Sequence, residues 1–141
     1  LQNYLATITG LDAVSVQPAA GAHGELAGML IFEAYHRSKG KKRSKILMPD
    51  TAHGTNPASA ALCGYKPVPI KSGDRGILDV DEIRELMDEE TAGIMVTNPN
   101  THGLFEENIR ENEEIDHEKG GLVYGDGANM NAIMGIDDMK K

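Results

Sequence analysis

Residues 46–63 read ILMPDTAHGTNPASAALC and combine a strand, a polar turn and a helix in one short unit. The apolar run ILM at 46–48 predicts a buried strand that Pro49 closes. The run PASAALC at 57–63 predicts a short helix with Pro57 in its first turn, where the missing N–H of proline is tolerated. A unit of this kind is typical of a parallel sheet covered by helices, with the polar turn at the carboxyl end of the strand.

The same alternation of strands and helices extends to both sides of this unit. We expect helices at 3–9, 23–38, 81–89 and 105–119, and strands at 14–16, 68–70, 93–97 and 121–124. Pro69 favours a sheet edge for its strand, and Asp79 or Asp81 is the expected cap of the helix that follows. The order predicts a single α/β domain over residues 1–141, with a mostly parallel sheet and helices on both faces.

The last predicted helix has an unusual inward face. One stripe at helical spacing contains Phe105, Ile109, Asn112 and Asp116, and its last two members are polar. Either the helix turns a polar face inward, which costs stability unless the polar groups are paired, or its buried stripe runs from Ile109 to Ile115. The two alternatives predict different burial for Asn112 and Asp116.

Composition restricts the classes of function. The 141 residues are 40% hydrophobic and 26% charged, and the net charge of −8 argues against a nucleic-acid partner or an anionic membrane surface. The basic run KGKKRSK at 39–45 is interpreted as a solvated loop, with a docking patch for an acidic partner as the alternative. Cys63 is the only cysteine, which excludes an internal disulfide and a cysteine-rich zinc site. No apolar run reaches the roughly 18 residues of a membrane span, and no signal-peptide segment is present.

Four turns that follow predicted strands carry polar or glycine-rich sequence. The first is AAGAHGE at 19–25, where small residues would let the backbone approach a ligand closely. The helix that follows would offer free N–H groups to a phosphate. The turn contains neither a Walker loop nor a dinucleotide fingerprint. The alternative is an ordinary tight turn between a strand and a helix.

The second and third turns each bring polar side chains to the end of a strand. In DTAHGTNP at 50–57, His53 can stack on a heteroaromatic ring or act in acid–base chemistry. The alternative there is a turn histidine bonded to the backbone. In TNPNTHG at 97–103, the asparagine amides can donate and accept hydrogen bonds, although an Asn-Pro pair also simply builds turns.

The fourth turn, YGDGAN at 124–129, brings Asp126 to the end of a strand between two glycines. A carboxylate there can keep a pyridine nitrogen protonated, and the protonated ring is the better electron sink. The alternatives are a metal-binding carboxylate and a helix cap. Because ligands of such sheets bind beyond the carboxyl ends of the strands, we expect all four turns to converge at one edge.

Together the four turns resemble one family. The segments QPAAGAHGELAGM, DTAHGTNPASA, TNPNTHGLFE and DGANMNAIMG are similar to glycine decarboxylase, the P-protein of the glycine cleavage system. The resemblance covers nearly the whole chain and implies the large domain of a fold-type-I enzyme that uses pyridoxal 5′-phosphate (PLP). The alternatives are another fold-type-I enzyme, such as a cysteine desulfurase or a different amino-acid decarboxylase, and a non-catalytic α/β module for another phosphate ligand.

The resemblance implies a role for the main polar residues of the turns. His53 and Asp126 are the candidate catalytic residues, with His53 stacked on the cofactor ring and Asp126 at its pyridine nitrogen. The backbone of three residues is expected to hold the cofactor phosphate, namely Gly21, Ala22 and His23. No metal ligand is assigned.

Two further cofactor contacts are implied in the same way. Ala128 would pack against the other face of the ring. Asn100 would lie near the phenolic oxygen of the ring, with Asn98 as the alternative. His102 departs from the family pattern, because it is bulkier and more polar than the residue expected beside this turn.

The resemblance also bears on the parent protein. The Schiff-base lysine of the family follows a histidine beyond the aspartate motif and would fall past Lys141, and neither Lys140 nor Lys141 follows a histidine. We therefore expect a piece of a larger protein, truncated before this lysine and inactive by itself.

The parent would be glycine dehydrogenase (aminomethyl-transferring, decarboxylating), an oxidoreductase of glycine catabolism. It would decarboxylate glycine and pass the aminomethyl group to a lipoyl carrier, the H-protein. A second P-protein subunit in a homo- or hetero-oligomer is implied. So is a cytoplasmic location, or the mitochondrial matrix in a eukaryote. No nucleic-acid or membrane partner is expected.

Overall fold

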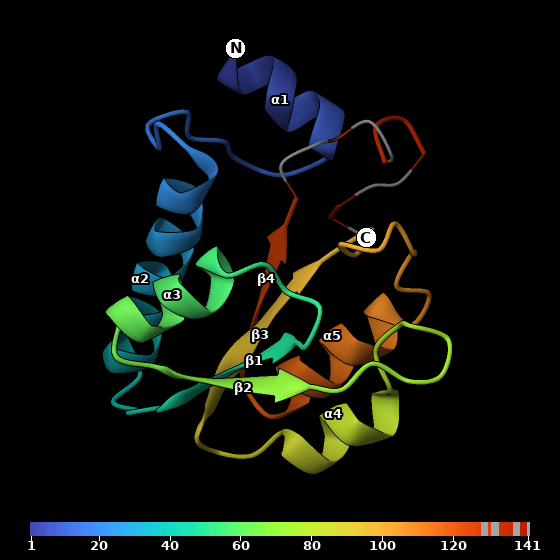
Figure 1. Ribbon diagram of the computed structural model, residues 1–141. Helices are drawn as coiled ribbons and strands as arrows, with labels where there is room; N and C mark the ends of the chain where they lie inside the picture. The colour runs from blue at the N-terminus through green and yellow to red at the C-terminus, as the bar shows by residue number, and fades with distance from the viewer. Residues whose placement is uncertain (128–129, 131–132, 137–138, 141) are drawn as a thin grey trace.

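A parallel sheet of four strands forms the centre of the molecule, in the order β2-β1-β3-β4 (Figure 1). The computed structural model describes residues 1–127, 130, 133–136 and 139–140. The strands are β1 (Lys45–Pro49), β2 (Lys66–Ile70), β3 (Thr91–Thr97) and β4 (Leu122–Asp126). All pairs are parallel, so the carboxyl ends of the four strands point the same way. Strand β2 contains Pro69 and lies at an edge, as predicted.

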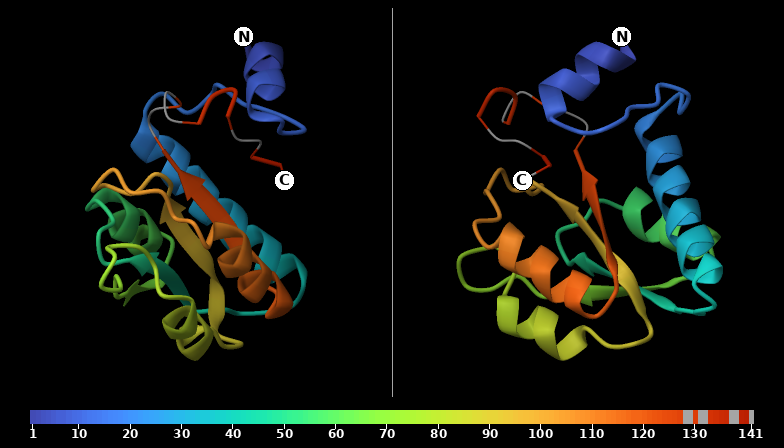
Figure 2. Two further views of the ribbon diagram at one scale, coloured as in Figure 1. Left: turned by 90° about the vertical axis from the view of Figure 1, so that its right-hand side faces the viewer. Right: turned by 180° about the vertical axis from the view of Figure 1, so that it is seen from behind.

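Two helices cover each face of the sheet, as the views from the side and from behind show (Figure 2). On one face, α2 (Gly21–Ser38) and α3 (Thr55–Leu62) enclose a core around Met29, Phe32 and Met95. On the other face, α4 (Val80–Leu86) and α5 (Ile109–Glu118) enclose a second core around Leu47, Ile83 and Ile94. Alternate side chains of β1 point to the two cores, which is the period of a strand. The predicted α/β architecture is therefore confirmed.

Strand β3 depends on a glycine where two layers come close. A Cβ atom at Gly93 would lie 1.9 Å from the Leu122 carbonyl oxygen and 2.7 Å from the Phe32 ring. The pairing of β1 with β3 also changes register next to this position. Any side chain at Gly93 would therefore push β4 or α2 away from β3, and β4 carries one of the candidate site residues.

The strand predicted at 14–16 is wrong. These residues join no strand ladder within the described ranges, and Val16 is 44% exposed. The segment is a connection between α1 (Gln2–Thr9), which ends at Gly10 as predicted, and α2. A short Val-Ser-Val segment has strand character only where a neighbouring strand takes up its backbone hydrogen bonds. The described sheet consequently has four strands, not five.

The last two helices are shorter than predicted. Helix α4 covers 80–86 rather than 81–89, and the Asp79 carboxylate caps it by accepting a hydrogen bond from the Asp81 N–H at 2.9 Å. Helix α5 begins at Ile109 rather than at 105, because Glu106 is held in the preceding turn. The Glu106 N–H donates to Asn98 Oδ1 at 3.0 Å, and its carboxylate accepts from the Leu78 N–H at 2.8 Å.

Helix α5 turns polar side chains inward. Asn112 is 1% exposed and Asp116 is fully buried, whereas Phe105 is exposed. Ile109 and Ile115 reach the core on the same side of the sheet, so the inward face mixes apolar and polar residues. The first alternative drawn from the sequence, a polar face turned inward, is therefore confirmed.

No helix in the described part of the chain has both the length and the apolar character that a membrane crossing requires.

Candidate functional site

Residues far apart in the sequence meet at the carboxyl edge of the sheet. His53 lies in the turn after β1 and Asp126 is the last residue of β4, and His53 Nε2 is 2.9 Å from Asp126 Oδ2. The start of α2 lies on the same side as the tip of β4 (Figure 1). The turn after β3 joins the turn after β1, where the Thr101 hydroxyl donates to the Thr51 carbonyl oxygen at 2.7 Å. The predicted convergence of the four turns at one edge is confirmed by these contacts.

Glu25, from the start of α2, is the third charged member of this group. One of its carboxylate oxygens, Oε1, lies 3.8 Å from His53 Nε2, and the residue is only 4% exposed. Burial raises the pKa of the Glu25 carboxyl, the negative charge of Asp126 raises it further, and His53 lowers it. The negative charge of Asp126 therefore acts on the Glu25 carboxyl, and both carboxylates lie next to the His53 imidazole.

Asn56 connects the two carboxylates. It is fully buried in the first turn of α3. With its amide nitrogen facing the site, that nitrogen lies 2.7 Å from Glu25 Oε2 and 3.3 Å from Asp126 Oδ2. The two N–H groups of the amide thus match two carboxylate acceptors, one on each side.

The hydrogen bonds of His53 define its tautomer. The Thr55 N–H donates to His53 Nδ1 at 3.3 Å, so Nδ1 is the acceptor nitrogen of the ring. The proton of the neutral imidazole consequently sits on Nε2, which donates to Asp126. We call the four residues Glu25, His53, Asn56 and Asp126 the edge cluster.

Thr97 and Tyr124 complete the surroundings of Asp126. The Thr97 hydroxyl, at the end of β3, donates to Asp126 Oδ2 at 3.2 Å. Burial raises the pKa of Tyr124 to about 12, and the charges of Asp126 and Glu25 add to the effect. The Tyr124 ring lies so close to α2 that a Cβ atom at Gly28 would come within 2.3 Å of it. This contact fixes the distance between α2 and β4, and so between Glu25 and Asp126.

The first predicted cofactor contact, the turn at the start of α2, is exposed. The helix begins at Gly21, and its N-cap Ala20 makes no side-chain hydrogen bond to the free N–H groups. The N–H of His23 donates to the Ala20 carbonyl oxygen at 3.0 Å. A phosphate contact by the His23 N–H, as at an anion-binding helix terminus, would have to share or replace this bond. The phosphate contacts of Gly21, Ala22 and His23 stay a prediction.

Asn100 is committed to its own turn. Its amide nitrogen donates to the Gly76 carbonyl oxygen at 2.9 Å and to Glu106 Oε1 at 3.0 Å. Its amide oxygen accepts from the N–H groups of His102 and Leu104. A contact with a cofactor would have to replace one of these bonds, and the role of Asn100 stays a prediction. His102 is exposed.

Two remaining predictions concern the C-terminal segment. Ala128 and Lys141 lie outside the described residues. Lys140 forms an ion pair with Asp12.

Sequence reasoning missed three members of the site, namely Glu25, Asn56 and Thr97. All three stand inside the quoted turns, but each has an ordinary local explanation: a helical glutamate, a turn asparagine and a strand-end threonine. Asn56 and Thr97 contact Asp126, and Glu25 contacts Asn56, and these partners are distant in sequence, so only the fold brings them together.

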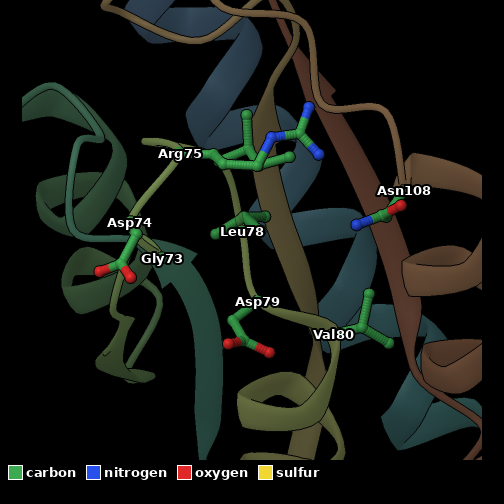
Figure 3. Close-up of a pocket in the computed structure, with 8 residues that line it drawn as sticks. Gly73, Asp74, Arg75, Leu78, Asp79, Val80 and Asn108 are labelled. Carbon is green, nitrogen blue, oxygen red and sulfur yellow. The ribbon is translucent and has the colours of Figure 1, made fainter.

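Two other features bear on ligand binding. Glu25, His53 and Asp126 each offer one ligand atom, and these atoms lie within 4.8 Å of one another, which is a spacing that a metal ion could bridge. A separate surface pocket lies between the segment 73–80 and Asn108 (Figure 3). It includes no member of the edge cluster.

Comparison with known proteins identifies close relatives of the sequence. A protein of Shouchella clausii is 55% identical over 137 residues, and one of Staphylococcus aureus is 56% identical over 135 residues. Both bear the name probable glycine dehydrogenase (decarboxylating) subunit 2. These matches cover 96% and 95% of this chain, but the chain spans only 28% of the length of either relative. No family model matches the chain. The resemblance drawn from the four turns is confirmed.

Solved structures share the fold at low sequence identity. Oryza sativa TDC, solved with PLP and tryptamine, has a TM-score of 0.73 at 17% identity, over 90% of this chain and 33% of that one. The sphingosine-1-phosphate lyase of Burkholderia pseudomallei has a TM-score of 0.69 at 21% identity, over 75% of this chain and 25% of that one. The fold is therefore that of the fold-type-I enzymes.

Proposed function

We propose that this chain, homologous over nearly its whole length to subunit 2 of glycine dehydrogenase (decarboxylating), is the PLP-binding segment of a glycine decarboxylase. The observation that carries the proposal is the 2.9 Å contact between His53 and Asp126 at the carboxyl edge of the sheet. At this edge the buried residues Glu25 and Asn56 and the exposed His53 surround the Asp126 carboxylate, which a pyridine nitrogen could reach. Another fold-type-I enzyme, such as a cysteine desulfurase or a different amino-acid decarboxylase, was the alternative drawn from the sequence, but the high sequence identity is to glycine dehydrogenase subunit 2.

The hydrogen-bond donors around Asp126 are compatible with a protonated pyridine nitrogen bound to its carboxylate. Thr97 and Asn56 each direct a donor to Oδ2 of this carboxylate, and both hold it in place without neutralising it. An ionised, oriented carboxylate is what a protonated ring nitrogen needs. When bound, PLP supplies an electron sink for the carbanion left by loss of carbon dioxide.

The other residues of the edge would bind and orient the cofactor. The exposed N–H groups at the start of α2 would take the phosphate, with Gly21, Ala22 and His23 as the predicted contacts. His53 would stack on the ring, and Ala128 would cover the opposite face. Asn100, or Asn98, would reach the phenolic oxygen only after giving up a bond within its turn.

The substrate and partners follow from the same proposal. The complete enzyme would act on glycine and deliver the aminomethyl group to the lipoyl carrier, and a second P-protein subunit would complete its oligomer. Because a PLP enzyme of this kind needs a Schiff-base lysine, and none is assigned in this chain, we expect no glycine decarboxylation by the 141 residues alone. The cytoplasmic location stays a prediction.

A titration followed by absorbance tests the proposal. The chain is mixed with PLP, pyridoxamine, pyridoxine phosphate and a nucleotide, and we expect binding of the compounds that combine the ring with the phosphate. His53→Ala and Asp126→Ala should each weaken binding about tenfold, as expected for loss of one hydrogen bond to a charged group. The matched controls, exposed His117→Ala and Asp74→Ala, should leave binding unchanged. A preference for the nucleotide, or equal binding by all four variants, would contradict the proposal.

A further inference from the structure

Glu25 is the member of the edge cluster that the proposed function leaves without a role. Its carboxylate is almost fully buried, and a buried carboxylate is costly unless it is paired. Oε2 accepts from the Asn56 amide at 2.7 Å. The other oxygen, Oε1, faces His53 Nε2 at 3.8 Å, which is too far for a hydrogen bond. One oxygen of Glu25 is thus anchored, and the other stands beside the imidazole.

The neutral His53 ring has one N–H donor, and two carboxylates lie 2.9 Å and 3.8 Å from its Nε2 atom. Because Nδ1 accepts from the Thr55 N–H, the single proton of the neutral ring is on Nε2. That proton goes to Asp126 at 2.9 Å, and Glu25 Oε1 is the next acceptor. Oδ2 of Asp126 also accepts from Thr97 and Asn56, so a ligand nitrogen that donates to this oxygen would displace His53 from it.

We propose that Glu25 is a positioning residue that accepts the His53 Nε2 hydrogen bond when a ligand nitrogen engages Asp126. The inference rests on the proposed function, since the ligand nitrogen is that of the pyridine ring. No proton changes owner: the Nε2–H bond stays intact and only its acceptor changes. Glu25 thereby keeps His53 bonded at the edge of the site rather than free to turn into solvent.

The electrostatics of the cluster support this exchange. The negative charge of Asp126 is one cause of the raised pKa of the Glu25 carboxyl. A cationic ring nitrogen at Asp126 would offset that charge and favour the ionised form of Glu25. The ionised carboxylate is the stronger acceptor for an N–H group. Binding of the ligand nitrogen at Asp126 therefore makes the Glu25 carboxylate a stronger acceptor for the His53 Nε2–H group.

A test without any cofactor uses the 141-residue chain with ¹⁵N-labelled histidine. Asp126→Ala removes the first acceptor, and the exchange of the His53 Nε2 proton with water is measured by NMR. We expect the proton to stay protected in Asp126→Ala and to exchange about fivefold faster in the double variant with Glu25→Gln, since a charged acceptor forms the stronger hydrogen bond. Glu33→Gln, a change of a half-buried glutamate on the same helix whose ion-pair partner is Arg37, is the matched control. Equal exchange with and without the Glu25 carboxylate would overturn the proposal.

A second arm adds pyridoxine 5′-phosphate, which has the pyridine nitrogen but no aldehyde, to the wild-type chain and to Glu25→Gln. We expect the exchange rate of the His53 Nε2 proton to differ between the wild-type chain and Glu25→Gln only in the presence of this ligand. The 1-deaza analogue, which lacks the ring nitrogen, should not produce the dependence. If neither compound binds, the proposed function fails, while the Asp126→Ala comparison still decides the role of Glu25.

Discussion

Two groups of polar side chains differ in how they are paired: the edge cluster at the carboxyl edge of the sheet, in which Glu25 and Asn56 are buried, and the buried pair Asn112 and Asp116 on α5. In the edge cluster, each carboxylate and the His53 ring has a polar partner, and the Asn56 amide serves both carboxylates. On α5, the side chains of Asn112 and Asp116 have no hydrogen-bond partner among the described residues. Burial of polar groups is common to both, so their partners must decide whether burial supports function or only lowers stability.

Asp116 is the extreme case on α5. Its carboxylate lies against Gly121, where a Cβ atom would come within 2.3 Å of Oδ1. Burial raises the pKa of Asp116 to about 7, although the charge of Arg43 lowers it. We therefore expect the α5 pair to oppose folding, whereas the edge cluster holds its own hydrogen bonds.

The largest expected effect is a gain in stability at Asp116. Replacing it by valine, Asp116→Val, should raise the free energy of unfolding by about 4 kcal/mol above neutral pH, the cost of ionising a carboxyl whose pKa has risen by about three units. Urea unfolding at pH 8 measures this change. Glu114→Val, an exposed change on the same helix, is the control for helix propensity and should have little effect. If Asp116→Val does not raise the free energy of unfolding, the Asp116 carboxylate must be either exposed to solvent or paired with a hydrogen-bond donor.

The next effect is a pH dependence of stability. The pKa of Asp116 is higher in the folded state than the usual 3.8, so the folded chain binds more protons between these values. Stability should accordingly fall as pH rises, by about 3 kcal/mol between pH 5 and pH 8 from this group alone. The difference between the wild-type chain and Asp116→Asn, each unfolded in urea across that range, isolates the contribution. Parallel curves for the two proteins would contradict it.

A smaller gain is expected at Asn112. Replacing it by isoleucine removes an amide whose oxygen and nitrogen are both unpartnered, and should raise the free energy of unfolding by about 2 kcal/mol. Because Asn112 and Asp116 are one helical turn apart, the two gains need not add, and a double-mutant cycle with Asp116→Val measures their coupling. A loss of stability in Asn112→Ile would show that the amide has a partner after all.

The smallest expected change in the free energy of unfolding is a loss, and it compares the edge cluster directly with α5. Asn56→Ala removes a buried amide from the edge cluster and should lower the free energy of unfolding by about 1.5 kcal/mol, because Glu25 Oε2 loses its amide donor while Asp126 keeps its donors from His53 and Thr97. Urea unfolding of Asn56→Ala beside Asn112→Ile compares the loss of a partnered and an unpartnered amide. If both changes had the same sign, the difference between the two groups would be refuted.

Much of the fold could be predicted from sequence because apolar periodicity and breaking residues are local signals. The strand at 46–48, the helix after it and the edge position of the strand with Pro69 follow from such signals. The segment 14–16 contains two β-branched valines, but a strand also needs a neighbour, and none of the described strands pairs with it. The start of α5 was missed because the Glu106 side chain binds two distant backbone and amide groups.

The candidate site also contains residues that could be predicted from the sequence and residues that could not. His53 and Asp126 could be predicted, since a strand end and a distinctive turn mark each of them. Glu25 and Asn56 could not, because their importance arises from a distance of a few ångströms across the fold rather than from any local pattern. The polar residues of α5 could be recognised as exceptions to periodicity, but only the structure shows that they lack hydrogen-bond partners.

The most direct test of the central claim is the protonation state of the cofactor ring at Asp126. PLP labelled with ¹⁵N at the ring nitrogen is added to the chain, and its chemical shift is followed as the pH is raised. We predict that the bound nitrogen keeps its proton at a pH where the free cofactor has lost it, and that Asp126→Ala abolishes this difference. A bound nitrogen that titrates like that of free PLP, or that is unaffected by Asp126→Ala, would contradict the assignment of this edge as the cofactor site.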